Sequence, residues 1–227
     1  MKFLRNVAPL LLLFVFCITF ISANSQGKEA NKVDASAKVL KDFVNMKEKI
    51  PQKLLDVTQG IIVIPRLINA GLGIGGKRGK GIAVIRRADG TWSNPAFITL
   101  TGGSIGFQAG IQSIDLVLIF KDRGTLEKIG NGSFTLGGDA SVTAGPVGRN
   151  SSASTDYKME AEIYSYSRSK GLFAGISLSG SALAVDSKSD AAFYGQPADA
   201  KSIFSGLANS NSSSVANLKT TLQNLHQ

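Results

Sequence analysis

The residues whose types and spacing could hold a phosphate group lie in the stretch NAGLGIGGKRGKG, residues 69–81. Gly71, Gly73 and Gly76 fit the pattern G-x-G-x-x-G of dinucleotide-binding loops, and the segment from Gly71 to Lys77 fits the phosphate-loop pattern G-x-x-x-x-G-K. Both loops hold a phosphate at the N-terminus of the helix that follows, where backbone N–H groups converge. The stretch therefore raises the question of nucleotide binding.

The sequence after this stretch argues against a nucleotide. Residues 81–87, GIAVIRR, are short and rich in β-branched side chains, which is typical of a strand and not of a helix. Arg78 stands where the phosphate loop has a serine or threonine for magnesium, and the acidic residue of the dinucleotide motif is missing from residues 94–100. We therefore predict that the glycines join two antiparallel strands, and we expect no nucleotide.

The cations of the stretch are still compatible with binding a different kind of phosphate group. Lys77, Arg78 and Lys80 could hold the phosphate of a lipid headgroup. The alternative is a solvated turn whose cations discourage pairing at a sheet edge.

Side chains suited to catalysis are scarce. His226 is the only histidine and lies one residue from the C-terminus, which argues against a Ser-His-Asp arrangement and against a histidine metal site. The carboxylates are scattered, and Asp186 with Asp190 lacks the full ligand spacing of a calcium site. We predict no enzymatic activity, no metal and no cofactor.

The N-terminus predicts export. MKFLRN is followed by the apolar run of residues 7–23 and then by small residues, the pattern of a secretory signal peptide over residues 1–25. Cleavage is expected after Ser25 or after Ala23, and an uncleaved anchor is the alternative because 17 apolar residues are just enough to span a bilayer. The remaining part, residues 26–227, has no cysteine and is expected in the periplasm or outside the cell.

The charge of the chain favours anionic partners. The net charge is +9, or +7 without Lys2 and Arg5 of the signal segment. A basic exported protein suits lipid headgroups, acidic polymers or nucleic acid, although the excess charge could serve only solubility.

The apolar patterning predicts helices at both ends of the chain and strands between them. A helix over residues 28–49 has one apolar stripe, and Pro51 opens a short second helix. Helical patterning returns over 199–209 and 212–225, with Ser213 or Ser214 as N-cap of the last helix. Strands are expected over 60–65, 79–87, 96–112, 113–121, 133–145, 156–167 and 171–185, with turns at Asp89-Gly90 and at 167–171.

These elements predict an α+β fold over residues 26–227. We expect a single domain with a glycine-rich antiparallel β-sheet or barrel-like core, with helices from both chain ends packed on it.

Four segments of the sequence resemble the SYLF domain family. They are DGTWSNPAFITLTGGSIGFQAG (89–110), LGGDASVTAGPVGR (136–149), YSYSRSKGLFAGISLSGSALAVD (164–186) and AAFYG (191–195). The similarity runs from about Leu40 to Leu225. It implies a lipid-binding module: eukaryotic members bind phosphoinositide membranes through a basic amphipathic N-terminal segment, some bind actin, and bacterial members are exported or attached to the envelope. Export would separate this chain from cytosolic actin and phosphoinositides.

Carried onto this sequence, the resemblance makes residues 28–49 the membrane-facing element. The cations that it implies for lipid binding are Lys32, Lys38, Lys41, Lys47 and Lys49, assisted by Lys77, Arg78 and Lys80. The alternative is that the apolar stripe, including Leu40, Phe43 and Val44, packs on the sheet.

The sequence thus predicts an exported, non-enzymatic module that associates with an anionic phospholipid or membrane surface through phosphate-bearing headgroups. The alternative is a structural or protein-interaction module of the cell envelope, with an envelope protein as its partner. Nucleic acid and nucleotides are not expected as partners.

Overall fold

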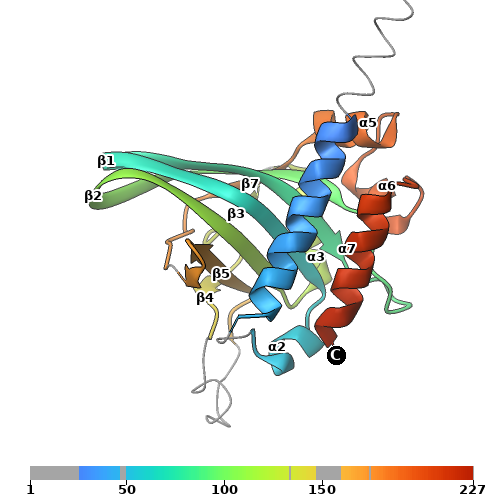
Figure 1. The fold of residues 1–227 in the computed structure, drawn as a ribbon, viewed down its shortest axis with the longest axis horizontal. Helices are drawn as coiled ribbons and strands as arrows, with labels where there is room; N and C mark the ends of the chain where they lie inside the picture. The colour runs from blue at the N-terminus through green and yellow to red at the C-terminus, as the bar shows by residue number, and fades with distance from the viewer. Residues whose placement is uncertain (1–25, 47–49, 133, 147–159, 174, 227) are drawn as a thin grey trace, which may run out of the picture.

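The computed structural model describes residues 26–46, 50–132, 134–146, 160–173 and 175–226 (Figure 1). The predicted signal peptide, residues 1–25, lies outside these ranges, and so do Lys47 and Lys49. The described chain forms one strongly curled β-sheet with helices packed on it, so the predicted α+β fold is confirmed.

Two long strands build the centre of the sheet. They are β1 (Gly60–Ile85) and β2 (Ala96–Phe120), which pair antiparallel along nearly their whole length. The chain turns between them at Asp89-Gly90, as predicted, and Gly90 takes the positive φ of +80° that this turn requires. Figure 1 shows both strands reaching far beyond the helices and returning.

β1 folds back on itself at its glycines. A Cβ atom on Gly71 would lie 2.7 Å from the Cα atom of Gly75, and a Cβ atom on Gly81 would lie 1.9 Å from the carbonyl oxygen of Val63. The two arms of β1 therefore lie against each other, at a distance that only a residue without Cβ permits. The prediction that the glycine stretch is a connection between two separate strands is wrong, because residues 69–81 lie inside the single strand β1 and pair with β2.

The other strands extend the sheet from the two ends of β2. β5 (Ile163–Ser169) and β7 (Ala182–Val185) pair with β2, β3 (Phe134–Thr135) pairs with β7, and β4 (Val142–Ala144) and β6 (Leu172–Phe173) pair with β5. These pairings are antiparallel, with the parallel β4–β5 pair as the exception. With the arms of β1 and β2 counted separately, the described strands number nine and form a half-barrel.

Both faces of the sheet are buried at its base. Ile61 and Val63 point into one apolar cluster, while Ile62 and Ile64 point into another on the opposite face. Alternation of side chains along a strand explains this division, and burial on both faces explains why these strands read as continuous apolar runs.

Helices from both chain ends cover one of these faces. They are the helix over 26–44, α2 (Gln52–Asp56), α5 (Ser187–Tyr194) and α7 (Ser213–Gln223), which is followed by η2 (Asn224–His226). The first helix and α7 lie side by side across the sheet (Figure 1), and the amide of Asn217 joins Asp34 to Lys41. The opposite face is covered by α3 (Arg123–Glu127), η1 (Lys128–Asn131) and α6 (Ala200–Ser205).

The apolar stripe of the first helix belongs to the core. Val33, Ala37 and Phe43 have no exposed surface, and Leu40 is 1% exposed. The expectation that this stripe faces a membrane is therefore wrong for this structure. The stripe packs on the sheet, because that face of β1 and β2 presents apolar side chains along its whole base.

Two details of the helices differ from the sequence prediction. Ser212 is the N-cap residue of α7, one residue before the predicted Ser213. α5 was not predicted, because its sequence SKSDAAFY has only one buried large apolar residue, Phe193. This helix begins where the carboxylate of Asp186 accepts a hydrogen bond from the backbone of Ser189.

Candidate functional site: a projecting β-ribbon and its cleft

The outer part of the β1–β2 ribbon projects beyond the helices, and we call it the tongue (Figure 1). It comprises residues 68–80 of β1 and 99–113 of β2, which pair with each other. Both strands of the tongue are rich in glycine, and β1 folds back on itself there. Because glycine has no side chain, few side chains within the tongue can pack against one another.

Large apolar side chains are exposed at the end of the tongue. Leu72, Ile74 and Ile111 are 81%, 83% and 78% exposed, and we call these three residues the apolar tip. With Ile68 they make four of the seven large apolar side chains that the described part of the chain exposes. Such a concentration marks an interaction surface more often than scattered single residues do.

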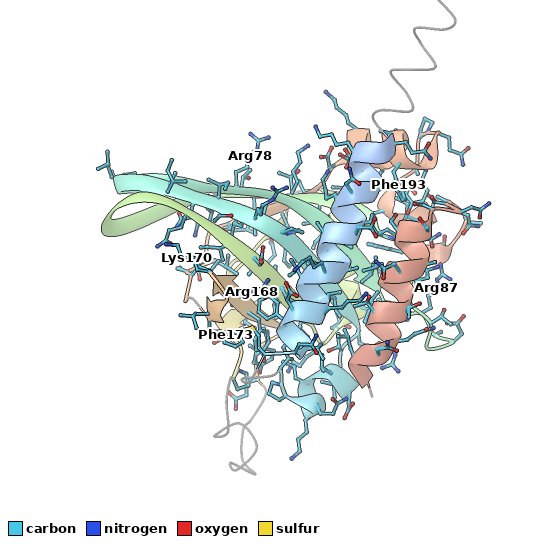
Figure 2. The ribbon with its side chains drawn as sticks, viewed as in Figure 1. Arg78, Arg87, Arg168, Lys170, Phe173 and Phe193 are labelled. Atoms are coloured by element: carbon cyan, nitrogen blue, oxygen red, sulfur yellow. The ribbon has the colours of Figure 1, made fainter. Side chains whose placement is uncertain are left out.

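The tongue carries cations and no acid. The only acidic residue between residues 57 and 114 is Asp89, at the turn that joins β1 to β2. Arg78 is exposed and extends away from the ribbon (Figure 2). Lys80 is half-exposed and forms an ion pair of 2.5 Å with Asp186, so its charge is partly compensated.

Lys77 differs from its two neighbours because it is buried. Its side chain lies against the segment of residues 175–180, and its ammonium group donates a hydrogen bond to the carbonyl oxygen of Ser177. Removal of the ammonium from water lowers the pKa of Lys77 below the usual value for lysine.

A cleft of about 580 Å³ opens beside Lys77. Both arms of β1, the outer half of β2 and the segment of residues 175–180 form its walls. Leu67 and Ile114 are fully buried at the cleft, and Ile74 of the apolar tip also lines it. The side-chain oxygen of Asn69, another lining residue, is buried and has no hydrogen-bond donor within the described residues.

The lysines of the first helix are not part of the tongue. Lys32 pairs with Glu29 and lies 5.1 Å from the centre of the Phe97 ring. Lys38 pairs with Asp42 at 2.8 Å, and Lys41 donates to the side chain of Asn217 at 3.1 Å. The predicted cations are therefore divided between the first helix and the tongue, with Lys47 and Lys49 outside the described residues. On the helix, Lys38 and Lys41 are exposed, whereas the side chain of Lys32 is only 15% exposed and lies against the core.

The two carboxylates that were considered for a calcium site, Asp186 and Asp190, have structural contacts. Asp186 caps α5 and pairs with Lys80, and Asp190 accepts a hydrogen bond from the backbone of Phe97. Within the described ranges, no group of three or more histidine, cysteine, aspartate or glutamate side chains could hold a metal ion. Across the same residues, no helix is both long enough and apolar enough to span a bilayer.

Sequence reasoning found the cations of the tongue but missed the apolar tip and Asn69. A signal for the tip was present: in GLGIGG the large apolar residues alternate with glycines. Glycine has no side chain to pack against them, so they are poorly covered by their own strand.

The described chain thus combines a curled sheet, covering helices, an exposed apolar tip and an adjoining cleft. The family model described as the Las17-binding protein actin regulator, Ysc84, matches residues 101–225, more than half of the chain. The chain therefore belongs to the SYLF family, as its sequence motifs predict.

Individual relatives agree with this assignment. LAS seventeen-binding protein 3 of Saccharomyces cerevisiae is 36% identical over 188 residues, which cover 82% of this chain and 41% of the relative. SH3 domain-containing YSC84-like protein 1 of Xenopus laevis is 37% identical over 168 residues, covering 71% of this chain and 50% of the relative. The chain thus spans at most about half the length of these relatives, which are named as binding or domain-containing proteins.

Proposed function

We propose that the protein is an exported, non-enzymatic module that attaches to membranes rich in anionic phospholipid, and that the tongue makes the contact. The observation that carries this proposal is the apolar tip at the end of a ribbon that has cations and no acid. Apolar side chains at such an extremity can enter the acyl boundary of a bilayer, while cations behind them meet the headgroups.

The magnitudes favour the tip as the main contributor to membrane affinity. Full removal of a leucine or isoleucine side chain from water is worth about 1.5–3 kcal/mol. A lysine or arginine near an anionic surface contributes about 1 kcal/mol. Because Lys77 is buried and Lys80 is paired, Arg78 is the tongue cation best placed to act on headgroups. Three apolar side chains therefore outweigh the exposed Arg78 in their contribution to affinity.

Co-sedimentation with vesicles tests this proposal. The unmodified protein should bind vesicles that contain phosphatidylglycerol more tightly than vesicles of phosphatidylcholine alone, and added salt should weaken the preference. Leu72→Asp should reduce binding at least tenfold, and Arg78→Ala should reduce it about fivefold on anionic vesicles only. Leu207→Asp is the matched control, because Leu207 is also 81% exposed but lies outside the tongue. Equal loss in Leu72→Asp and Leu207→Asp would refute the role of the tip.

A protein partner in the cell envelope is the second candidate. The names of relatives such as LAS seventeen-binding protein 3 favour it, since they describe binding to another protein. The same apolar tip would serve as the contact. In that case Leu72→Asp abolishes capture of a defined envelope protein, while binding to protein-free vesicles is absent from the outset.

Export is also part of the proposal and rests on the signal-like sequence of residues 1–25. N-terminal sequencing of the protein recovered outside the cytoplasm should begin at Gln26 or at Asn24. Recovery of the intact chain from a membrane fraction would instead support the uncleaved anchor.

A further inference from the structure

The cleft beside the tongue has the features of a binding site for a small amphipathic molecule. Its volume of about 580 Å³ lies in the range of small-molecule sites, and its walls combine apolar side chains with a few polar groups. It lies next to the apolar tip, because Ile74 belongs to both. A molecule that is still held in a bilayer could therefore reach the cleft with one end.

Lys77 provides the cleft with a positive charge that no carboxylate of the described residues meets. The residue is 7% exposed, and within the described residues its ammonium group is paired with the carbonyl oxygen of Ser177 and forms no ion pair. An ammonium group has three N–H donors, so donors remain for a ligand. A buried charge is costly unless a counter-charge meets it, and an anion in the cleft would supply one.

Asn69 provides the cleft with an acceptor. Its side-chain oxygen is shielded from water and has no donor among the described residues. A buried acceptor without a donor costs about 1–3 kcal/mol, and a ligand hydroxyl group would remove that cost. Because Lys77 and Asn69 line the same cleft, together they favour a ligand that has both an anionic oxygen and a hydroxyl group.

The apolar walls specify the rest of the ligand. Leu67 and Ile114 are fully buried at the cleft, and Ile176 of the segment 175–180 also lines it. These side chains favour the first methylenes of an acyl chain over water. A free polyol phosphate has no group to place there.

We propose that the cleft binds the headgroup of one anionic, hydroxylated phospholipid such as phosphatidylglycerol. The phosphate lies at Lys77, a headgroup hydroxyl donates to Asn69, and the acyl chains leave past Ile74 toward the bilayer. The assignment rests on the proposed membrane function but concerns a separate part of the tongue. Leu72 contributes to membrane affinity regardless of the headgroup, while Lys77 and Asn69 determine which headgroup binds.

Calorimetric titration with short-chain lipid tests the cleft without a membrane. Dihexanoyl phosphatidylglycerol, kept below its micelle concentration, should bind saturably with one molecule per chain. Lys77→Met keeps the apolar stem and removes the charge, and it should weaken binding at least tenfold. Asn69→Leu should weaken binding about fivefold, and Leu72→Asp should leave it unchanged. Thermal unfolding of each variant separates loss of the site from loss of the fold.

The outcomes distinguish the cleft from the membrane contact. Absence of saturable binding, or full affinity in a folded Lys77→Met variant, overturns the cleft assignment. Binding of glycerol 3-phosphate as tight as that of the short-chain lipid also overturns it, because the site would then serve a free polyol phosphate. If the unmodified protein ignores vesicles yet binds the short-chain lipid, the membrane proposal fails and the cleft assignment stands.

Discussion

The backbone amide of Phe97 donates a hydrogen bond of 2.8 Å to the carboxyl group of Asp190, which has no exposed surface. The second oxygen of this carboxyl group is buried and has no partner among the described residues. Burial raises the pKa of Asp190 to about 7, the hydrogen bond from Phe97 opposes the shift, and the nearby carboxylates of Asp186 and Glu29 add to it. Lys32 acts in the opposite direction.

The raised pKa of Asp190 predicts a loss of stability as pH rises. The folded chain holds this proton up to about pH 7, while the unfolded chain releases it near the ordinary value of 3.8. The free energy of unfolding therefore falls between about pH 4 and pH 7. Asp190→Asn lacks this titration, so its stability relative to the unmodified protein should rise over that window by up to about 4 kcal/mol. Urea unfolding at pH 4, 6 and 8 measures the difference; a constant difference would show that Asp190 is ionised throughout.

Arg168 joins β5 to both β2 and the first helix. Its guanidinium group lies 2.7 Å from the carboxylate of Asp115 and 3.0 Å from that of Asp42, with the guanidinium carbon 5.4 Å from the centre of the Phe43 ring (Figure 2 shows Arg168). The arginine side chain is 14% exposed, so the two carboxylates would lose a largely buried partner in Arg168→Ala.

We expect Arg168→Ala to lower the free energy of unfolding by about 2 kcal/mol. Arg123→Ala is the control, because its ion pair with Glu127 is 3.7 Å long and exposed on both sides. That variant should change stability by less than about 0.5 kcal/mol. If chemical denaturation gave the same loss of stability for Arg168→Ala and Arg123→Ala, the ion pairs of Arg168 would contribute no more than an exposed surface pair.

Gly81 lies where the two arms of β1 approach most closely. A Cβ atom there would lie 1.9 Å from the carbonyl oxygen of Val63 and 2.8 Å from the Cα atom of Ile64, and both are backbone atoms that cannot rotate away. Gly81→Ala should therefore lower the free energy of unfolding by about 3 kcal/mol. Gly76→Ala is the control in the same glycine stretch, since its nearest contact would be an ordinary 3.7 Å. A melting temperature unchanged in Gly81→Ala would refute the close packing of the arms.

Much of the fold could be predicted because the apolar patterning is local. The runs at 60–65 and 81–85 predict strands, and their continuity agrees with burial on both faces. The short helix α5 could not be predicted, since its position depends on Phe193 packing against Phe97, more than ninety residues earlier in the sequence.

The candidate site was harder to predict, because exposure depends on the tertiary structure. Leu72 and Ile111 are ordinary strand residues in sequence, and they become exposed only because the ribbon projects beyond its covering helices. Lys77 and Arg78 are adjacent cations of one motif, yet strand alternation buries the first and exposes the second. A phosphate-loop pattern contains no information on burial, so it cannot distinguish Lys77, which lies in the cleft, from Arg78, which lies on the surface.

The burial of Lys77 predicts that lipid binding depends on pH. Desolvation lowers the pKa of its ammonium group, so the free protein loses this charge at a lower pH than an ordinary lysine would. The protonated form is the one that meets a phosphate, and affinity for short-chain phosphatidylglycerol should therefore fall as pH rises through the lowered pKa. Titrations between pH 7 and pH 10.5 should show this decline together with proton uptake on binding. Lys77→Met should bind weakly at every pH in this range, and a pH-independent affinity in the unmodified protein would place the phosphate elsewhere in the cleft.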